Sequence, residues 1–159
     1  MKKQHAIMLI LTTISGNALE WYDFALYGYF APVIAKLFFP LQNEFVSFLI
    51  TFSVFASGFL VRPLGGAIFG HIGDKYGRRS ALIVSIGLIT VPTTLMGLVP
   101  TFNSIGIAAP ILFTLLRLLQ GVAVSGELTG SGAFLVESAP KNQRGFYGSL
   151  VMCSIYFGL

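Results

Sequence analysis

Ionisable side chains interrupt the long apolar stretches of this 159-residue chain, and their chemistry stands out first. They are Glu20, Asp23, Arg62, Arg117 and Glu127. A charge inside a hydrophobic span is costly unless it is paired or wetted, so we expect these groups to face protein or water. An acid in such a place can take and release a proton, and an arginine can hold an anionic group.

Spacing along the chain predicts which of these charges can meet. At about 1.5 Å per residue, Glu20 and Asp23 lie about 21 to 26 Å from the start of a first helix, and Arg117 lies about 18 Å below the outer end of a fourth. Arg117 is therefore a reachable partner for either acid. Arg62 and Glu127, both placed in the inner half, are expected to form a second pair.

Two interpretations of these charges stay open. Buried ion pairs can simply fix the register of neighbouring helices. The alternative is a polar pathway for a proton and a substrate, and Tyr22, which lies between Glu20 and Asp23 on a helix rich in aromatic residues, favours it.

The composition places these residues in a membrane protein. Hydrophobic residues make up 55% of the chain and charged residues 10%, and the mean hydropathy is +0.80. Such a chain would leave apolar faces uncovered in water after one core was filled. The net charge of +4 is scattered between loops and helices, which argues against nucleic acid as a partner.

Because a bilayer core of about 30 Å needs about 20 helical residues, the sequence divides into helical spans. We expect an all-α, polytopic membrane bundle with helices at residues 6–35, 45–70, 80–99, 105–136 and 146–159. The short connections make successive helices antiparallel. The last segment is too short to cross, so we expect residues 1–159 to be a partial N-terminal transmembrane domain of a longer protein, a truncated gene product or a cropped chain.

Positive charge predicts the orientation of the bundle. Lys36 alone falls at one end of the predicted spans. The cations at the other end are Lys2, Lys3, Lys75, Arg78, Arg79, Lys141 and Arg144. The positive-inside bias therefore places the N-terminus in the cytoplasm. A cleaved secretory signal is the competing interpretation, but apolar sequence continues past any cleavage point, which favours an uncleaved first helix.

Two motifs lie in the loop after the second span and in the fourth span: Gly70-x-x-x-Asp74-Lys75-x-Gly77-Arg78-Arg79 and Arg117-x-x-x-Gly121. Together they resemble the signature loop and the helix-four motif of the major facilitator superfamily. Further segments narrow the resemblance to the metabolite:proton symporters, the branch with proline/betaine, 2-oxoglutarate, shikimate and citrate transporters. These segments are residues 16–24, 62–66, 119–121 and 145–149.

The resemblance implies the N-terminal half of a transporter that works by alternating access. It implies a gating role for the loop residues Gly70, Asp74, Gly77, Arg78 and Arg79. In that scheme Asp74 stabilises the inward-closed arrangement, and Arg78 pairs with an acid at the inner end of helix four, here Glu137.

We therefore expect proton-coupled symport of a small polar metabolite, carboxylate-bearing or zwitterionic, across the cell inner membrane. The partners would be the substrate, protons, the lipid bilayer and the missing C-terminal half. No cofactor or metal is expected beyond the proton gradient, because His5 and His71 lack partners at metal-ligand spacing. An enzyme is not expected, since no nucleophile, base and orienting acid assemble. The alternative is a truncated, non-transporting membrane remnant or interaction partner.

Overall fold

The computed structural model describes residues 3–159, and side chains at residues 14–77, 80–126, 135–136 and 139–159. Within this part the regular structure is entirely helical, which confirms the all-α prediction. The elements are α1 (Lys3–Phe38), α2 (Glu44–Leu60), α3 (Arg62–Tyr76), α4 (Arg78–Leu98), α5 (Phe102–Ile105), α6 (Ala108–Ser138), the 3-10 turn η1 (Lys141–Gln143) and α7 (Arg144–Gly158).

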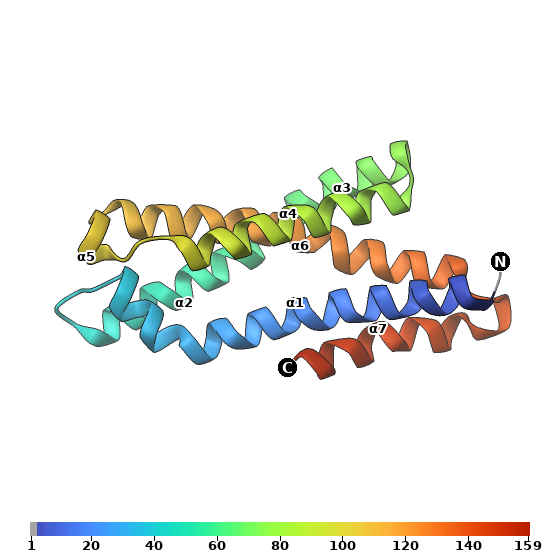
Figure 1. Ribbon diagram of the computed structural model, residues 1–159, viewed down its shortest axis with the longest axis horizontal. Helices are drawn as coiled ribbons and strands as arrows, with labels where there is room; N and C mark the ends of the chain where they lie inside the picture. Colours follow the sequence, from blue (N-terminus) through green and yellow to red (C-terminus); the bar gives the residue numbers. More distant parts are fainter. Residues whose placement is uncertain (1–2) are drawn as a thin grey trace.

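The long helices lie roughly along one common axis, and their connections alternate between the two ends of the bundle (Figure 1). The start of α1, the turn between α3 and α4, and the link from α6 to α7 lie at one end. The link from α1 to α2 and the short helix α5 lie at the other. Helix α6 runs through the centre and contacts α1, α2, α3, α4 and α7. Successive spans are therefore antiparallel, as predicted.

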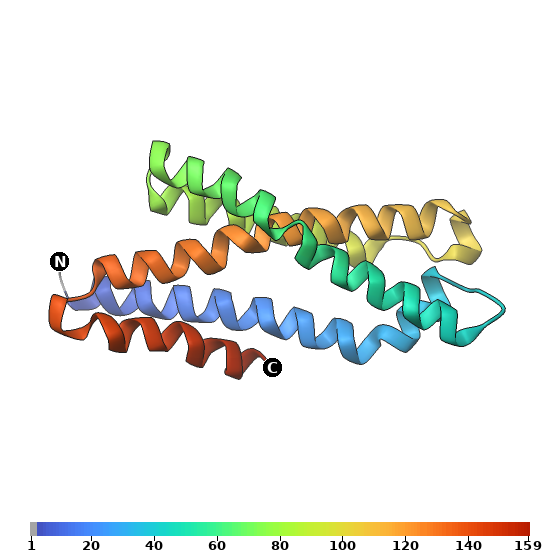
Figure 2. The ribbon, with the colours of Figure 1, turned by 180° about the vertical axis from the view of Figure 1, so that it is seen from behind.

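The second predicted span, residues 45–70, is not one continuous helix. It is divided at Val61 into α2 and α3, which together form a bent rod (Figure 2). Pro63 lies two residues after the break and has no backbone N–H, and its ring crowds the carbonyl four residues earlier. The bend that proline imposes places Arg62 at the level of the middle of α6.

The predicted loop over residues 70–79 is also mostly helical. Helix α3 continues to Tyr76, and the turn is reduced to Gly77, whose φ of 89° is open to glycine but strained for other residues. Helix α4 follows directly at Arg78. The charged motif therefore forms the end of one helix and the start of the next rather than an extended connection.

The predicted fourth span, residues 105–136, also differs at its start. Helix α5 is separate, Gly106 at φ 59° turns the chain, and α6 begins only at Ala108. Part of the predicted link over residues 137–145 is the turn η1, after which α7 begins at Arg144. Glycine and proline residues end helices at these places, and the observed helix boundaries therefore differ from the predicted ones by a few residues. Composition alone locates such boundaries poorly.

Among the described residues, three helical segments are long and apolar enough to cross a membrane: Glu44–Tyr76, Ser80–Leu98 and Ala108–Gly126. The first of them spans the break at Val61. Large apolar side chains such as Leu60, Leu64, Ile83 and Leu98 are exposed on these helices, as expected for surfaces that face lipid.

Candidate functional site

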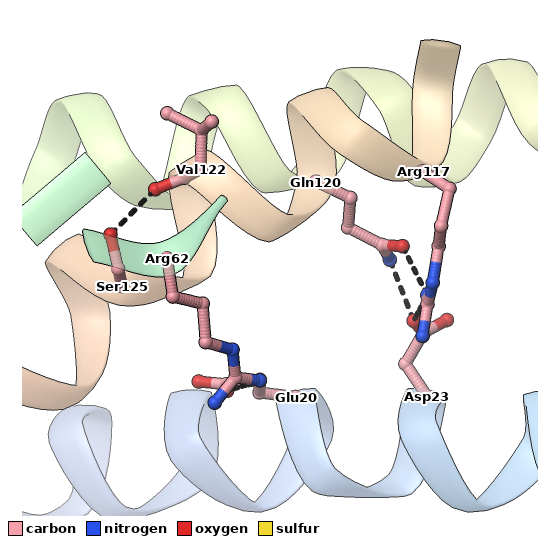
Figure 3. Close-up of polar contacts among 7 residues, drawn as sticks. All are labelled: Glu20, Asp23, Arg62, Arg117, Gln120, Val122 and Ser125. Atoms are coloured by element: carbon pink, nitrogen blue, oxygen red, sulfur yellow. Dashed lines mark hydrogen bonds and ion pairs between the residues drawn. The ribbon is translucent and has the colours of Figure 1, made fainter. Parts of the chain in front are cut away.

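Asp23 of α1 and Arg117 of α6 form an ion pair inside the bundle (Figure 3). Arg117 Nη1 lies 3.6 Å from Asp23 Oδ2. The arginine side chain is 2% exposed, whereas the aspartate side chain is 34% exposed. The predicted meeting of Arg117 with one of the two acids of the first helix is therefore present in the structure.

Gln120, one turn after Arg117 on α6, connects the two partners of this pair. Its Oε1 accepts a hydrogen bond from Arg117 Nη1, and its Nε2 donates to Asp23 Oδ2 at 2.6 Å. The same nitrogen donates to Thr93 Oγ1 of α4 at 3.0 Å. Sequence reasoning did not assign Gln120 or Thr93 to the site. The available signal was the spacing of three between Arg117 and Gln120, which puts both on one helix face.

A second ion pair joins Arg62, at the start of α3, to Glu20 of α1. The atoms Arg62 Nη2 and Glu20 Oε1 lie 3.6 Å apart, and the side chains are 18% and 2% exposed. The predicted partner of Arg62 was Glu127, whose side chain lies outside the described residues. The structure instead brings Arg62, the first residue of α3, to Glu20, and the long arginine side chain reaches across to α1 (Figure 3).

Aromatic rings surround both guanidinium groups. The Arg117 guanidinium carbon lies 4.5 to 4.9 Å from the ring centres of Phe24, Tyr27 and Phe55. The corresponding carbon of Arg62 lies 4.9 Å from Phe24 and 4.3 Å from Phe59. Cation–π contacts of this kind stabilise buried arginines, so the rings offset part of the desolvation cost. Phe24 contacts both cations and thus links the two pairs.

The spacing of residues in α1 explains why one helix serves both pairs. Glu20, Asp23, Phe24 and Tyr27 lie at positions i, i+3, i+4 and i+7, which form a single helix face. The predicted pathway residue Tyr22 is not on this face and is 53% exposed. Tyr22 nevertheless lines a cavity of about 450 Å³, together with Glu20 and Asp23.

This cavity lies between α1, α4 and α6, and its lining includes Asp23, Glu20, Thr93 and Gln120. A second cavity of about 420 Å³ also includes Asp23 and Thr93 and reaches Arg117 and Phe113. Asp23 therefore borders both cavities, which accounts for its partial exposure.

Of the residues to which the resemblance assigns a gating role, Asp74 and Gly77 are exposed near the turn between α3 and α4, and Gly70 is half-buried one turn before Asp74. The side chains of Arg78, Arg79 and Glu137 lie outside the described residues, so their predicted contacts stay predictions. The turn lies at the end of the bundle, far along α3 from Arg62 (Figure 1).

Comparison with known proteins gives a consistent picture. Residues 8–159 match the family model described as "Sugar (and other) transporter". The chain is 44% identical over 134 residues to the proline/betaine transporter of Escherichia coli (strain K12), covering 84% of this chain and 27% of that protein. It is 44% identical over 150 residues to the shikimate transporter of the same strain, covering 94% of this chain and 34% of that protein.

It is also 46% identical over 140 residues to the citrate-proton symporter of Salmonella typhi, covering 88% of this chain and 32% of that protein. The chain thus spans about a third or less of the length of these relatives. No solved structure matches it significantly.

Proposed function

Because the chain belongs to the sugar and other transporter family, a branch of the major facilitator superfamily, we propose that it forms the first part of a proton-coupled symporter for a small polar metabolite. The family consists of membrane transporters rather than enzymes, and the chain is an integral membrane protein. The observation that carries the proposal is the Asp23–Arg117 pair, in which a partly exposed acid lies beside a buried arginine.

Asp23 is the proposed proton acceptor. Its carboxylate borders both cavities, so a proton can reach it from water in either. When Asp23 is ionised, it attracts Arg117; when it is protonated, that attraction is lost and the arginine becomes available to another anion. Within the described residues, Arg117 Nη2 is buried without a hydrogen-bond partner, so the guanidinium retains a donor for a ligand.

The proposed substrates carry a carboxylate and are acids or zwitterions. An arginine recognises a carboxylate through paired hydrogen bonds, and apolar side chains such as Phe30, Ile34 and Phe113 line the cavity that reaches Arg117 and can contact the remainder of a small molecule. The relatives named for proline, betaine, shikimate and citrate support this class, because each of these compounds has a carboxyl group. No cofactor is proposed, since the proton gradient supplies the energy.

The remaining predicted residues complete this scheme. Glu20, Arg62, Tyr22 and Glu127 are proposed to line the pathway. The proposed gating residues are Gly70, Asp74, Gly77, Arg78, Arg79 and Glu137. A C-terminal half would supply the opposite wall of the substrate site, as the greater length of the relatives suggests. We also propose that the protein lies in the cell inner membrane with its N-terminus in the cytoplasm, in keeping with the positive-inside bias.

Uptake into proton-tight vesicles that contain the full-length protein tests this proposal. A pH gradient, acid outside, should drive accumulation of a carboxylate or zwitterionic substrate, and a protonophore should abolish it. Arg117→Ala should remove uptake, whereas Arg78→Ala should slow conformational exchange and leave binding intact.

Two results would argue against the proposal. One is uptake that ignores the gradient for every substrate bound. The other is a reading frame with no coding sequence after Leu159, which would favour the non-transporting alternative.

A further inference from the structure

We propose that Gln120 is a positioning residue that keeps Asp23 and Arg117 paired through its side-chain amide, so that Asp23 can change its charge while Arg117 keeps a hydrogen bond. The inference rests on the proposed function, because it assigns a role to Gln120 in the proton-coupled step. The sequence motifs contain Gln120, within residues 119–121, but assign it no role; the role follows from the geometry of three helices.

The amide adds two hydrogen bonds to the ion pair between the two charged groups. At 3.6 Å, the separation of Arg117 Nη1 and Asp23 Oδ2 exceeds the usual length of an N–H···O hydrogen bond. Gln120 lies beside the pair and bridges it, with Oε1 accepting from Arg117 Nη1 and Nε2 at 2.6 Å from Asp23 Oδ2 (Figure 3). Gln120 is 2% exposed, so water does not compete freely for these contacts.

Chemistry fixes which way the amide points. A guanidinium only donates hydrogen bonds and an ionised carboxylate only accepts them. The carbonyl oxygen of Gln120 must therefore face Arg117, and the NH₂ group must face Asp23. Thr93 of α4 accepts the second N–H at 3.0 Å and so holds the same orientation.

Protonation of Asp23 leaves this orientation intact. A protonated carboxyl group still has an oxygen that accepts from Gln120 Nε2. Arg117 therefore keeps its hydrogen bond to Gln120 Oε1 in both charge states of the acid. Without the amide, the nearly buried Arg117 guanidinium would lack the acceptor of Gln120. Each protonation of Asp23 would then also remove its charged partner, at considerable cost.

Comparison with the Arg62–Glu20 pair supports the assignment of the proton-coupled role to the Arg117–Asp23 pair. Glu20 and Arg62 have the same 3.6 Å separation, but the glutamate side chain is 2% exposed, against 34% for Asp23. Both acids line the cavity of about 450 Å³, but Asp23 is the more exposed and also borders the second cavity, so the carboxylate with easier proton exchange is the one that Gln120 holds.

The test compares two activities of the full-length transporter in proteoliposomes. One is accumulation driven by an imposed pH gradient, which requires Asp23 to release its proton in every cycle. The other is exchange of labelled for unlabelled substrate at equal pH, which does not. For Gln120→Leu we expect accumulation to fall about tenfold or more, since hydrogen bonds to charged groups are lost, with exchange within about twofold of the unmodified protein.

Gln120→Glu distinguishes a residue that joins Arg117 to Asp23 from one that only accepts a hydrogen bond from Arg117. Glutamate still accepts from Arg117 but, when ionised, cannot donate to Asp23, so we expect it to lose accumulation as Gln120→Leu does. Gln143→Leu is the matched control, because Gln143 is exposed in the turn η1 and should leave both activities unchanged.

Three results would overturn the inference. These are an equal fall of accumulation and exchange in both Gln120 variants, no change in either variant, or full accumulation in Gln120→Glu. If the unmodified protein shows neither accumulation nor exchange, the proposed function itself fails. In the three results above the unmodified protein is active, and only the role of Gln120 fails. Should Gln120→Leu not fold, the decision rests on Gln120→Glu.

Discussion

Gly121 of α6 lies directly against Gly58 of α2, so closely that a β-carbon on Gly121 would overlap the Gly58 backbone. A β-carbon on Gly58 would in turn lie 3.6 Å from the carbonyl oxygen of Arg117. This close crossing lets α2 place Phe55 against the Arg117 guanidinium. Small residues at a helix crossing thus determine the surroundings of the buried charge.

We expect Gly121→Ala to destabilise the bundle by about 1–3 kcal/mol, because the added methyl group forces α2 away from α6. Thermal unfolding in detergent measures the effect. Gly66→Ala is the matched control: Gly66 is also helical, but a β-carbon there meets no atom within 4 Å. The control should be neutral or slightly stabilising, since alanine favours helix over glycine. Equal effects of the two changes would argue against the close crossing.

Phe24→Leu should weaken both ion pairs, because the Phe24 ring lies under both Arg62 and Arg117. Each cation–π contact with a desolvated cation contributes about 2 kcal/mol, so we expect a loss of about 2–4 kcal/mol in the free energy of unfolding. The control is Phe48→Leu, because the Phe48 ring is partly exposed and makes an edge-to-face contact with Phe52. If Phe48→Leu lowers the free energy of unfolding as much as Phe24→Leu does, the Phe24 ring stabilises the protein through its volume alone and not through cation–π contacts.

Asn17→Leu should loosen α7 from α1. The buried Asn17 amide donates to Val151 O at 3.0 Å and to Ser154 Oγ at 2.6 Å. Removing the amide leaves these acceptors without that donor, at about 1–3 kcal/mol. Hydrogen exchange in α7 should rise, with Ser149→Ala as control, because the exposed Ser149 hydroxyl donates to Phe146 O of its own helix. Unchanged exchange in Asn17→Leu would show that packing alone holds α7.

Gly77→Ala should strain the turn between α3 and α4. Gly77 has φ 89° and ψ 149°, a region almost restricted to glycine, so an alanine there costs about 1–3 kcal/mol. Gly145→Ala is the matched control, because Gly145 is helical and has open space around it. Thermal unfolding of both variants checks the prediction, and a Gly77→Ala protein as stable as the control would contradict the observed turn.

The sequence by itself determined the class of the protein and much of its topology. Apolar runs of membrane length and charged links predicted an antiparallel helical bundle, because lipid excludes unpaired charge and unsatisfied backbone. The rise per residue along two helices was enough to predict that Arg117 reaches an acid of the first helix, which is Asp23.

Only the tertiary structure decided which of the two acids of the first helix each arginine meets. The pairing of Arg62 with Glu20 and the bridge through Gln120 depend on how α1, α3, α4 and α6 are placed and rotated about their axes. Depth in the membrane follows from counting residues along one helix. Contact between side chains follows from the way several helices cross and are rotated about their axes. Close packing at glycines determines this arrangement, and distance along the chain does not encode it.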